Sequence, residues 1–267
     1  MASVAFGKLN LHYLDAGTGP AVLLLHAFPL NKSMWAPQVS ALAPRYRLIA
    51  PDARGLGDSR PVPEALTMEL YADDAAAILD HVGVEKAVVV GLSMGGYAAL
   101  AFWRRHRARV TGLVLADTRA GADDEAGKAN RESFAASALR QGIDWVTAEM
   151  SPRLQRPTPI PGVDAEVRRL IQMNLAVGVA AAQRGMARRR DAMADLKDVC
   201  CPTLVMVGEL DALTPPNEAA RLAEAIPGAA LATLPGAGHL ANLEAPEAFN
   251  RALGDFLERA KPSRTAA

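Results

Sequence analysis

The chain has 267 residues, enough for one large hydrophobic core or for a core domain that carries an insertion. Lys plus Arg and Asp plus Glu both total 29, so the formal net charge is zero, which argues against binding nucleic acid or an anionic membrane through a broad basic surface. No apolar run approaches the roughly 20 residues of a membrane span, and the first residues lack the pattern of a signal peptide, so we expect a cytoplasmic protein.

Two cysteines, Cys200 and Cys201, are adjacent in the chain. Neighbouring residues rarely reach the geometry of an unstrained disulfide, so this pair builds no disulfide framework. No Cys/His spacing indicates zinc either. We therefore expect the protein to require neither a metal nor another cofactor.

Runs that are apolar at every position alternate with helical patterns along most of the chain. After two short strands within residues 4–15, such runs occupy residues 21–26, 46–52, 86–92, 110–117, 202–209 and 229–236. The periodicity also predicts a helix near 67–82 that ends at Gly83. Continuous apolar runs indicate strands covered on both faces, so the sequence predicts an α/β fold with a mostly parallel central sheet flanked by helices.

Residues 119–198 interrupt this alternation. They contain no clear strand, only helical stretches rich in Ala, Met and Arg and the turn RPTPIPG at 156–162. The segment is too long for a plain connection. We predict a helical cap (lid) at 119–198, inserted between two strands of a core domain that comprises residues 1–118 and 199–267.

The stretch VVVGLSMGGYAAL contains the pattern G-x-S-x-G as Gly91, Ser93 and Gly95. A buried strand leads into this pattern and a helix leads out of it. In so tight a turn the central residue has a strained backbone, and the residues two positions away must be small. We predict that Ser93 is a nucleophile at the N-terminus of the helix; the alternative is a serine that only caps that helix.

A nucleophilic serine needs a base, and His239 is the histidine best placed to serve. It lies in a Gly-rich loop after the last predicted strand, from which it can reach the sheet edge where Ser93 emerges. An acid must orient the imidazole. We favour Asp211, just beyond a strand end, because of its loop and the chain order Ser, Asp, His. Asp117, after another strand, is the competitor, and Glu209 is a weaker one.

Together these motifs resemble the α/β-hydrolase superfamily, in particular its small capped serine esterases and enol-lactonases. The resemblance covers nearly the whole chain, through the stretches LNLHYLDAGTGPAVLLLHAFP, PDARGLGDSRP, GLSMGGYAAL, GELDALTPP and GAGHLANLEAPEAF. It is weakest in the predicted cap. It implies a catalytic triad of Ser93, Asp211 and His239, in the chain order of that family.

The resemblance also interprets the stretch HAFP, which begins at His26. In relatives a His-Gly-x-Pro loop supplies one N–H group of the oxyanion hole, which here implies the backbone N–H groups of Phe28 and Met94. Ala27 stands where relatives have glycine, and this argues against a left-handed backbone at that position. We expect His26 itself to be structural and to hold the loop through hydrogen bonds.

The expected reaction is hydrolysis of carboxylic esters with small to medium acyl chains through an acyl-enzyme. Enol-lactone hydrolysis of the 3-oxoadipate type is the alternative, followed by cofactor-free perhydrolysis and by a non-catalytic ligand-binding protein on the same fold. A serine at the nucleophile position argues against haloalkane dehalogenase and epoxide hydrolase chemistry, for which those relatives use aspartate. We expect a small-molecule substrate, no nucleic-acid or membrane partner, and a monomer or small homo-oligomer.

The residues predicted to line the substrate pocket are apolar and favour a neutral acyl ester. They are Leu30, Trp35, Trp145, Met150, Leu213 and Leu240. A carboxylated lactone would instead require an arginine that faces the pocket. Arg119 and Arg153 are the candidates for that role, and the sequence alone does not orient their side chains.

Overall fold

The computed structural model describes residues 2–260, and its strands form a single sheet in the order β1-β2-β4-β3-β5-β6-β7-β8. The strands are β1 (Ala2–Phe6), β2 (Leu9–Ala16), β3 (Ala21–Leu25), β4 (Arg47–Pro51), β5 (Ala87–Leu92), β6 (Val110–Ala116), β7 (Thr203–Gly208) and β8 (Ala230–Leu234). β2 pairs antiparallel with both β1 and β4, and every other pair of neighbours is parallel. The predicted mostly parallel sheet is therefore confirmed.

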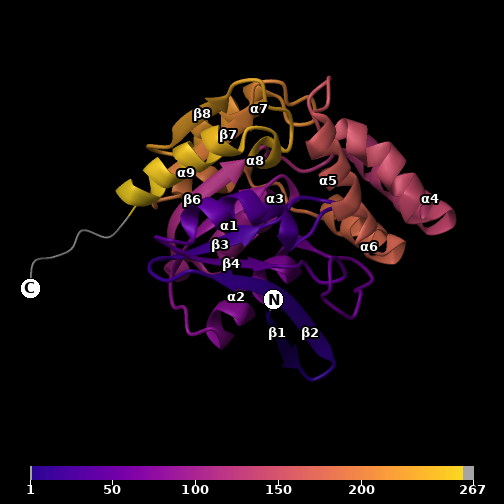
Figure 1. The fold of residues 1–267 in the computed structure, drawn as a ribbon, viewed down its shortest axis with the longest axis horizontal. Helices are drawn as coiled ribbons and strands as arrows, with labels where there is room; N and C mark the ends of the chain where they lie inside the picture. The colour runs from indigo at the N-terminus through magenta and orange to yellow at the C-terminus, as the bar shows by residue number, and fades with distance from the viewer. Residues whose placement is uncertain (1, 261–267) are drawn as a thin grey trace, which may run out of the picture.

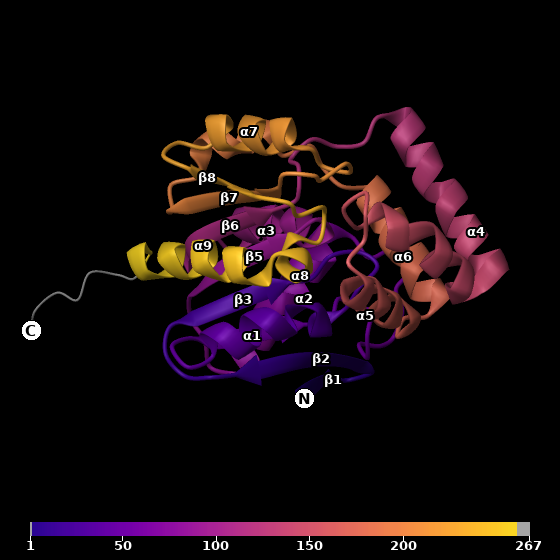
Figure 2. The same cartoon turned by 45° about the horizontal axis from the view of Figure 1, so that its top comes forward.

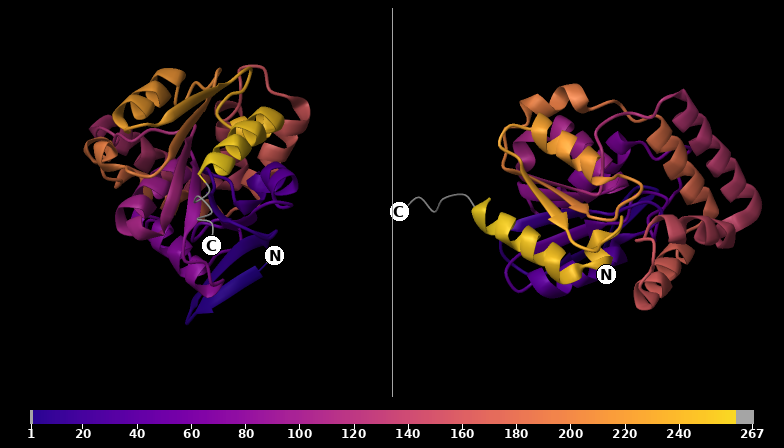
Figure 3. Two further views of the ribbon diagram at one scale, coloured as in Figure 1. Left: turned by 90° about the vertical axis from the view of Figure 1, so that its left-hand side faces the viewer. Right: turned by 90° about the horizontal axis from the view of Figure 1, so that it is seen from above.

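Helices cover both faces of this sheet (Figure 1). They are α1 (Ala36–Leu42), α2 (Met68–His81), α3 (Met94–Arg105), α4 (Glu125–Met150), α5 (Pro161–Gln172), α6 (Ala176–Ala187), α7 (Pro216–Ala225), α8 (Ala241–Glu244) and α9 (Pro246–Arg259), with short 3₁₀ turns between some of them. α1 and α9 lie against one face, and α2, α3 and α7 lie against the other (Figure 3). Among the described residues, no helix combines the length and the apolar character that crossing a membrane requires.

The local sequence explains these elements. Every position of β5 and β7 is buried, as expected for strands covered on both faces. The Thr67 side chain accepts a hydrogen bond from the Leu70 N–H and so caps α2. Gly83, with φ +69°, follows the end of the same helix, so the helix predicted near 67–82 is confirmed.

The chain between β6 and β7 is helical and lies at the end of the sheet to which the parallel strands point (Figure 2). α4 is bent at Gly142, whose φ of 82° and ψ of −175° divide it into a long and a short part. α4 packs along α6, and α5 contacts α4. This segment therefore stands beside the edge at which loops from several strands meet, where open parallel sheets place their ligands.

α6 and the turn before it are joined to loops of the sheet by one bond between backbone atoms and one to the Asn174 side chain. The Leu66 N–H donates to the Ala181 carbonyl at 2.9 Å, and the Gly57 N–H donates to Asn174 Oδ1 at 2.6 Å. At Gly185 a Cβ atom would lie 1.6 Å from the Leu66 carbonyl oxygen, so only glycine permits this approach. The contact is too close for side chains to intervene.

Candidate active site

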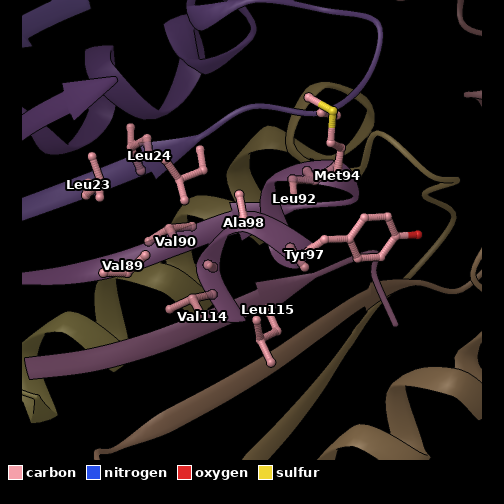
Figure 4. Close-up of a cluster of buried hydrophobic side chains, with 14 of the residues drawn as sticks. Leu23, Leu24, Val89, Val90, Leu92, Met94, Tyr97, Ala98, Val114 and Leu115 are labelled. Atoms are coloured by element: carbon pink, nitrogen blue, oxygen red, sulfur yellow. The ribbon is translucent and has the colours of Figure 1, made fainter. Parts of the chain in front are cut away.

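Ser93 occupies the turn between β5 and α3 and has a strained backbone. Its φ of 56° and ψ of −116° lie in a region that side chains rarely adopt. A Cβ atom at Gly91 would lie 2.1 Å from the Gly95 carbonyl oxygen, and one at Gly95 would lie 2.0 Å from the Leu25 carbonyl oxygen. Figure 4 shows the neighbouring core, with Leu92 near the turn and Ala98 on the helix next to the strand that carries Val90. The predicted strand-turn-helix around Ser93 is therefore present.

The side chains of Ser93, His239 and Asp211 are joined by hydrogen bonds. His239 Nε2 lies 2.8 Å from Ser93 Oγ, and His239 Nδ1 lies 2.9 Å from Asp211 Oδ2. An ionised carboxylate only accepts hydrogen bonds, so the proton of a neutral imidazole resides on Nδ1 and the Nε2 lone pair faces the serine hydroxyl. His239 and Asp211 are both buried. The arrangement is that of a serine with a general base and an orienting acid.

Asp211 is held by its own loop. Its Oδ1 accepts the backbone N–H groups of Leu213 at 2.9 Å and Thr214 at 3.0 Å, and its Oδ2 accepts the Thr214 hydroxyl at 2.6 Å. Burial favours the protonated acid, but His239 and the Thr214 hydrogen bonds outweigh burial and hold the pKa of Asp211 below its ordinary value. Asp211 therefore remains a carboxylate that can stabilise a protonated His239.

Asp117, the competing acid, is buried at the end of β6 and has a φ of 46°. Its Oδ1 accepts the Gly208 N–H at 2.8 Å, and its Oδ2 has no hydrogen-bond partner in the described chain. Burial, together with the nearby charge of Asp211, raises the pKa of Asp117 well above its ordinary value. No hydrogen bond joins it to His239 among the described residues. Glu209, the weaker rival, is exposed and accepts the Gly236 N–H.

His26 directly follows β3 and forms the expected structural hydrogen bonds. Its Nδ1 lies 2.9 Å from the Ala27 carbonyl oxygen, and its Nε2 accepts the Ala53 N–H at 2.9 Å. One nitrogen therefore donates and the other accepts, which requires a neutral ring. Burial lowers the pKa of His26 and favours the same neutral form. Ala27 does not have a positive φ, in agreement with the expectation from its side chain.

The two backbone N–H groups predicted for the oxyanion hole, those of Phe28 and Met94, lie in turns next to Ser93. Met94 is the first residue of α3, so its N–H has no acceptor within the helix. In the part of the chain that the structure describes, neither N–H donates to a protein acceptor. Both remain available to a ligand oxygen.

Ser93 and His239 open into a pocket of about 260 Å³ between the sheet loops and the helices that follow β6. It is lined by Phe28, Ser93, Tyr97, Arg119, Asn130, Arg131, Phe134, Met150, Arg153, Leu154, Gln183, Met186, Leu213, Thr214 and His239. Met150 and Leu213 are thus where we expected them. No group of three or more His, Cys, Asp or Glu side chains among residues 2–260 is placed to hold a metal ion.

The other four residues predicted to line the pocket do not line it. Leu30, Trp35 and Leu240 are fully buried in the core, Trp35 with its ring 6.2 Å from that of Phe249. Trp145 packs behind Phe134, with their ring centroids 4.9 Å apart, so Phe134 takes the place at the pocket wall. Leu30, Trp35 and Leu240 lie close to motifs in the sequence, but their side chains are in the core. Large apolar side chains gain the most free energy from full burial.

Sequence reasoning missed several residues of the pocket. Tyr97 lies one helical turn after Ser93, and that spacing alone could have placed it at the same helix end. Arg131 and Phe134 come from α4, three residues apart on one helix face. No motif marks them, because their position depends on how α4 packs over the sheet edge. Both candidate arginines, Arg119 and Arg153, do line the pocket.

Several known proteins are similar to this chain in fold and in sequence. A family model described as the alpha/beta hydrolase fold matches residues 20–246. The chain belongs to that family. It is 42% identical to a thermophilic esterase from Thermogutta terrifontis, solved with malate bound, with a TM-score of 0.92 and 95% of each chain covered.

Two curated proteins are also similar along nearly their whole length. One, from Caulobacter sp. (strain K31), carries the provisional name carbamate hydrolase RutD and is 31% identical, covering 94% of this chain and 97% of its own. The other, 3-oxoadipate enol-lactonase 1 of Acinetobacter baylyi, is 30% identical, covering 90% of this chain and 89% of its own. The names of these three similar proteins indicate different bonds but the same type of reaction, which is hydrolysis. The chain therefore belongs to a family of hydrolases that act on small molecules.

Proposed function

We propose that this protein is a serine hydrolase that cleaves carboxylic esters of small to medium acyl chain, with Ser93 as nucleophile, His239 as base and Asp211 as orienting acid. The observation that carries the proposal is the unbroken hydrogen-bonded series from Ser93 Oγ through His239 to Asp211 at the floor of a pocket. A serine that only caps a helix would need neither the strained backbone nor the imidazole.

In the proposed reaction His239 Nε2 takes the Ser93 proton while Oγ forms a bond to the ester carbonyl carbon. The oxygen of the tetrahedral intermediate is held by the N–H groups of Phe28 and Met94. The C–O bond to the alcohol then breaks, and the alcohol leaves with the proton from Nε2. Water, deprotonated by His239, attacks the acyl-serine, and collapse releases the carboxylic acid and restores Ser93.

We further propose that residues 119–198 form a cap over a core of residues 1–118 and 199–267. Residues of this segment, among them Phe134, Met150 and Gln183, supply one side of the pocket, while the core supplies Ser93 and His239. The chemistry and the choice of substrate would then reside in different parts of the chain.

The alternative is a lactonase of the 3-oxoadipate enol-lactonase type. It uses the same residues, but the alcohol stays attached to the acyl product. The similarity to the Acinetobacter baylyi lactonase and the arginines of the pocket are what favour it. Graded series of alkyl esters and enol-lactones, compared by kcat/KM, separate the two reactions.

The proposal is tested by covalent modification of Ser93. Stoichiometric labelling of Ser93 by a fluorophosphonate, and a burst of p-nitrophenol with p-nitrophenyl acetate, are expected. Ser93→Ala should abolish both, whereas Ser3→Ala, at an exposed serine of β1, should change neither. A wild-type protein that shows neither labelling nor a burst would refute the proposal and favour a non-catalytic binding protein.

A further inference from the structure

Three arginines surround one buried carboxylate beside the pocket. Arg189 donates to both oxygens of Asp123, at 2.5 and 2.8 Å, and Arg119 Nη2 donates to Oδ1 at 2.6 Å. Arg131 Nε donates to Oδ2 as well. Three guanidinium groups against one carboxylate leave two positive charges in the cluster. Burial opposes ionisation of Asp123, but Arg189 and Arg131 prevail and hold its pKa far below the ordinary value.

Two of these three arginines face the pocket. Arg119 and Arg131 line it together with Arg153, and no Asp or Glu is among its lining residues. Arg189 lies behind them, stacked on the Tyr97 ring at 4.5 Å. The hydroxyl of Tyr97 is directed away from the strands of the core (Figure 4). The part of the pocket wall formed by Arg119 and Arg131 is therefore positively charged, and no acidic side chain lines the pocket beside it.

Arg119 and Arg131 do not use all of their N–H groups in hydrogen bonds to the protein. A guanidinium group has five N–H donors in a planar fork. Arg131 uses Nε for Asp123 and Nη1 for Gln183 Oε1, at 2.9 Å, while Nη2 has no acceptor in the described chain. Arg119 uses Nη2 for Asp123 and also bonds Tyr97, and its Nε is buried away from the open pocket. An N–H group of a pocket-lining arginine that has no protein acceptor can pair with an anionic ligand.

We propose that the substrate is an ester or lactone that also bears a carboxylate, and that Arg119 and Arg131 bind this carboxylate while Ser93 attacks the other carbonyl group. The inference rests on the proposed function and names its substrate class. A carboxylate between the two side chains can accept one N–H from each, just as Arg119 and Arg131 each donate one N–H to Asp123. This replaces the neutral acyl ester that the sequence favoured.

A purely structural role does not account for the cluster. Arg189, with its side chain 3% exposed, already joins Asp123 to the Gly121 and Met186 carbonyls. Arg119 pairs with Asp123 four residues away and also bonds Tyr97 of α3, so it links its loop to that helix. Its side chain is 36% exposed and lines the pocket. These structural contacts leave part of the Arg119 guanidinium group exposed in the pocket, where it can bind an anion.

The test compares monoethyl glutarate with ethyl 5-methylhexanoate, in which an isopropyl group replaces the carboxylate at equal chain length. Proton release in a pH-stat gives kcat/KM for each ester. The wild type should prefer the anionic ester, and Arg119→Met and Arg131→Met should each lower the preference by about tenfold or more. Arg119→Lys keeps the charge without the fork and should lose less. Arg184→Met removes an exposed arginine that pairs with Glu132 on the surface, and should leave the preference unchanged.

Binding is measured separately by protection of Ser93 from a fluorophosphonate by free glutarate. Protection that weakens in Arg119→Met but not in Arg184→Met supports the inference. Equal kcat/KM for the two esters with no protection would overturn it and leave the serine hydrolase intact. Equal losses on both esters in Arg131→Met and Arg119→Met, with a lower Tm, would also overturn it and make the arginines structural. Absence of turnover and of labelling would instead refute the proposed function.

Discussion

Replacing Asp211 with asparagine should stop His239 from acting as a base without disturbing the fold. The amide oxygen can keep the two backbone N–H groups of Leu213 and Thr214 that Oδ1 now accepts. The amide NH₂ then takes the place of Oδ2, 2.9 Å from His239 Nδ1, and donates to it. Nδ1 becomes the acceptor, so the ring proton moves to Nε2 and faces Ser93. A base in the wrong tautomer is expected to lower kcat by about 10⁴-fold, or about 5.4 kcal/mol in the activation free energy.

Asp117→Asn is the matched control, since it makes the same change in a second buried carboxyl group. Its amide oxygen can accept the Gly208 N–H, and its NH₂ occupies the place of Oδ2, which has no partner now. Burial and the charge of Asp211 raise the pKa of Asp117 and so favour the neutral acid, which the amide resembles in charge. We expect kcat within about threefold of the wild type. The assays are p-nitrophenyl acetate turnover and the rate of Ser93 labelling, with Tm as the check on folding. An inactive Asp117→Asn beside an active Asp211→Asn would refute the assignment of the acid.

Three further predictions test the turn at Ser93, the oxyanion loop and the alkaline limit of stability. Gly95→Ala places a Cβ atom 2.0 Å from the Leu25 carbonyl oxygen, so we expect about 1–3 kcal/mol lower stability in urea and loss of Ser93 labelling; wild-type labelling would show that the turn has room. Ala27→Gly should cost about 0.5–1 kcal/mol without raising kcat, because Ala27 does not have a positive φ; a higher kcat would mean that the stiffness of the loop limits turnover. Burial and the hydrogen bond to Glu258 raise the pKa of Tyr46 to about 12 from 10.0, so its contribution to stability is present below pH 10 and is lost as pH rises toward about 12. Urea midpoints of Tyr46→Phe should fall less steeply than those of the wild type in that range, and parallel curves would contradict the prediction.

The sequence predicts those features of the fold and site that local patterns determine. A run such as AVVVGL at β5 is apolar throughout because both its faces are buried, so it can be recognised without knowing its neighbours. Parallel strands end at one edge of the sheet, so residues placed just after different strands, such as Ser93 and Asp211, are brought together by topology alone. Gly91 and Gly95 mark the turn because the backbone itself leaves no room for a side chain.

The side chains of the pocket could not be predicted in the same way. Trp35 and Leu240 lie near motifs in the sequence, but their surroundings in space are those of the core. Arg131 reaches the pocket because α4 crosses over the sheet edge, and the angle of that crossing depends on contacts between α4 and α6 far apart in the chain. The charge of the pocket depends on the same packing, since it places Arg131 beside Arg119 on Asp123. The proposed substrate class therefore rests on tertiary structure.

The close contact between α6 and the sheet loops limits which chain segments can be exchanged between related proteins. Residues 119–198 look like a module, but Gly185 fits against Leu66, and Asn174 accepts from Gly57, only when both partners keep their shape. A chimera that takes the helical segment alone would set a foreign helix on these loops and lose the close approach. One that also takes residues 55–67 carries both halves of the joint. If the helical segment determines substrate choice as proposed, the unit to exchange is two pieces of chain, separated in sequence by α2, β5, α3 and β6.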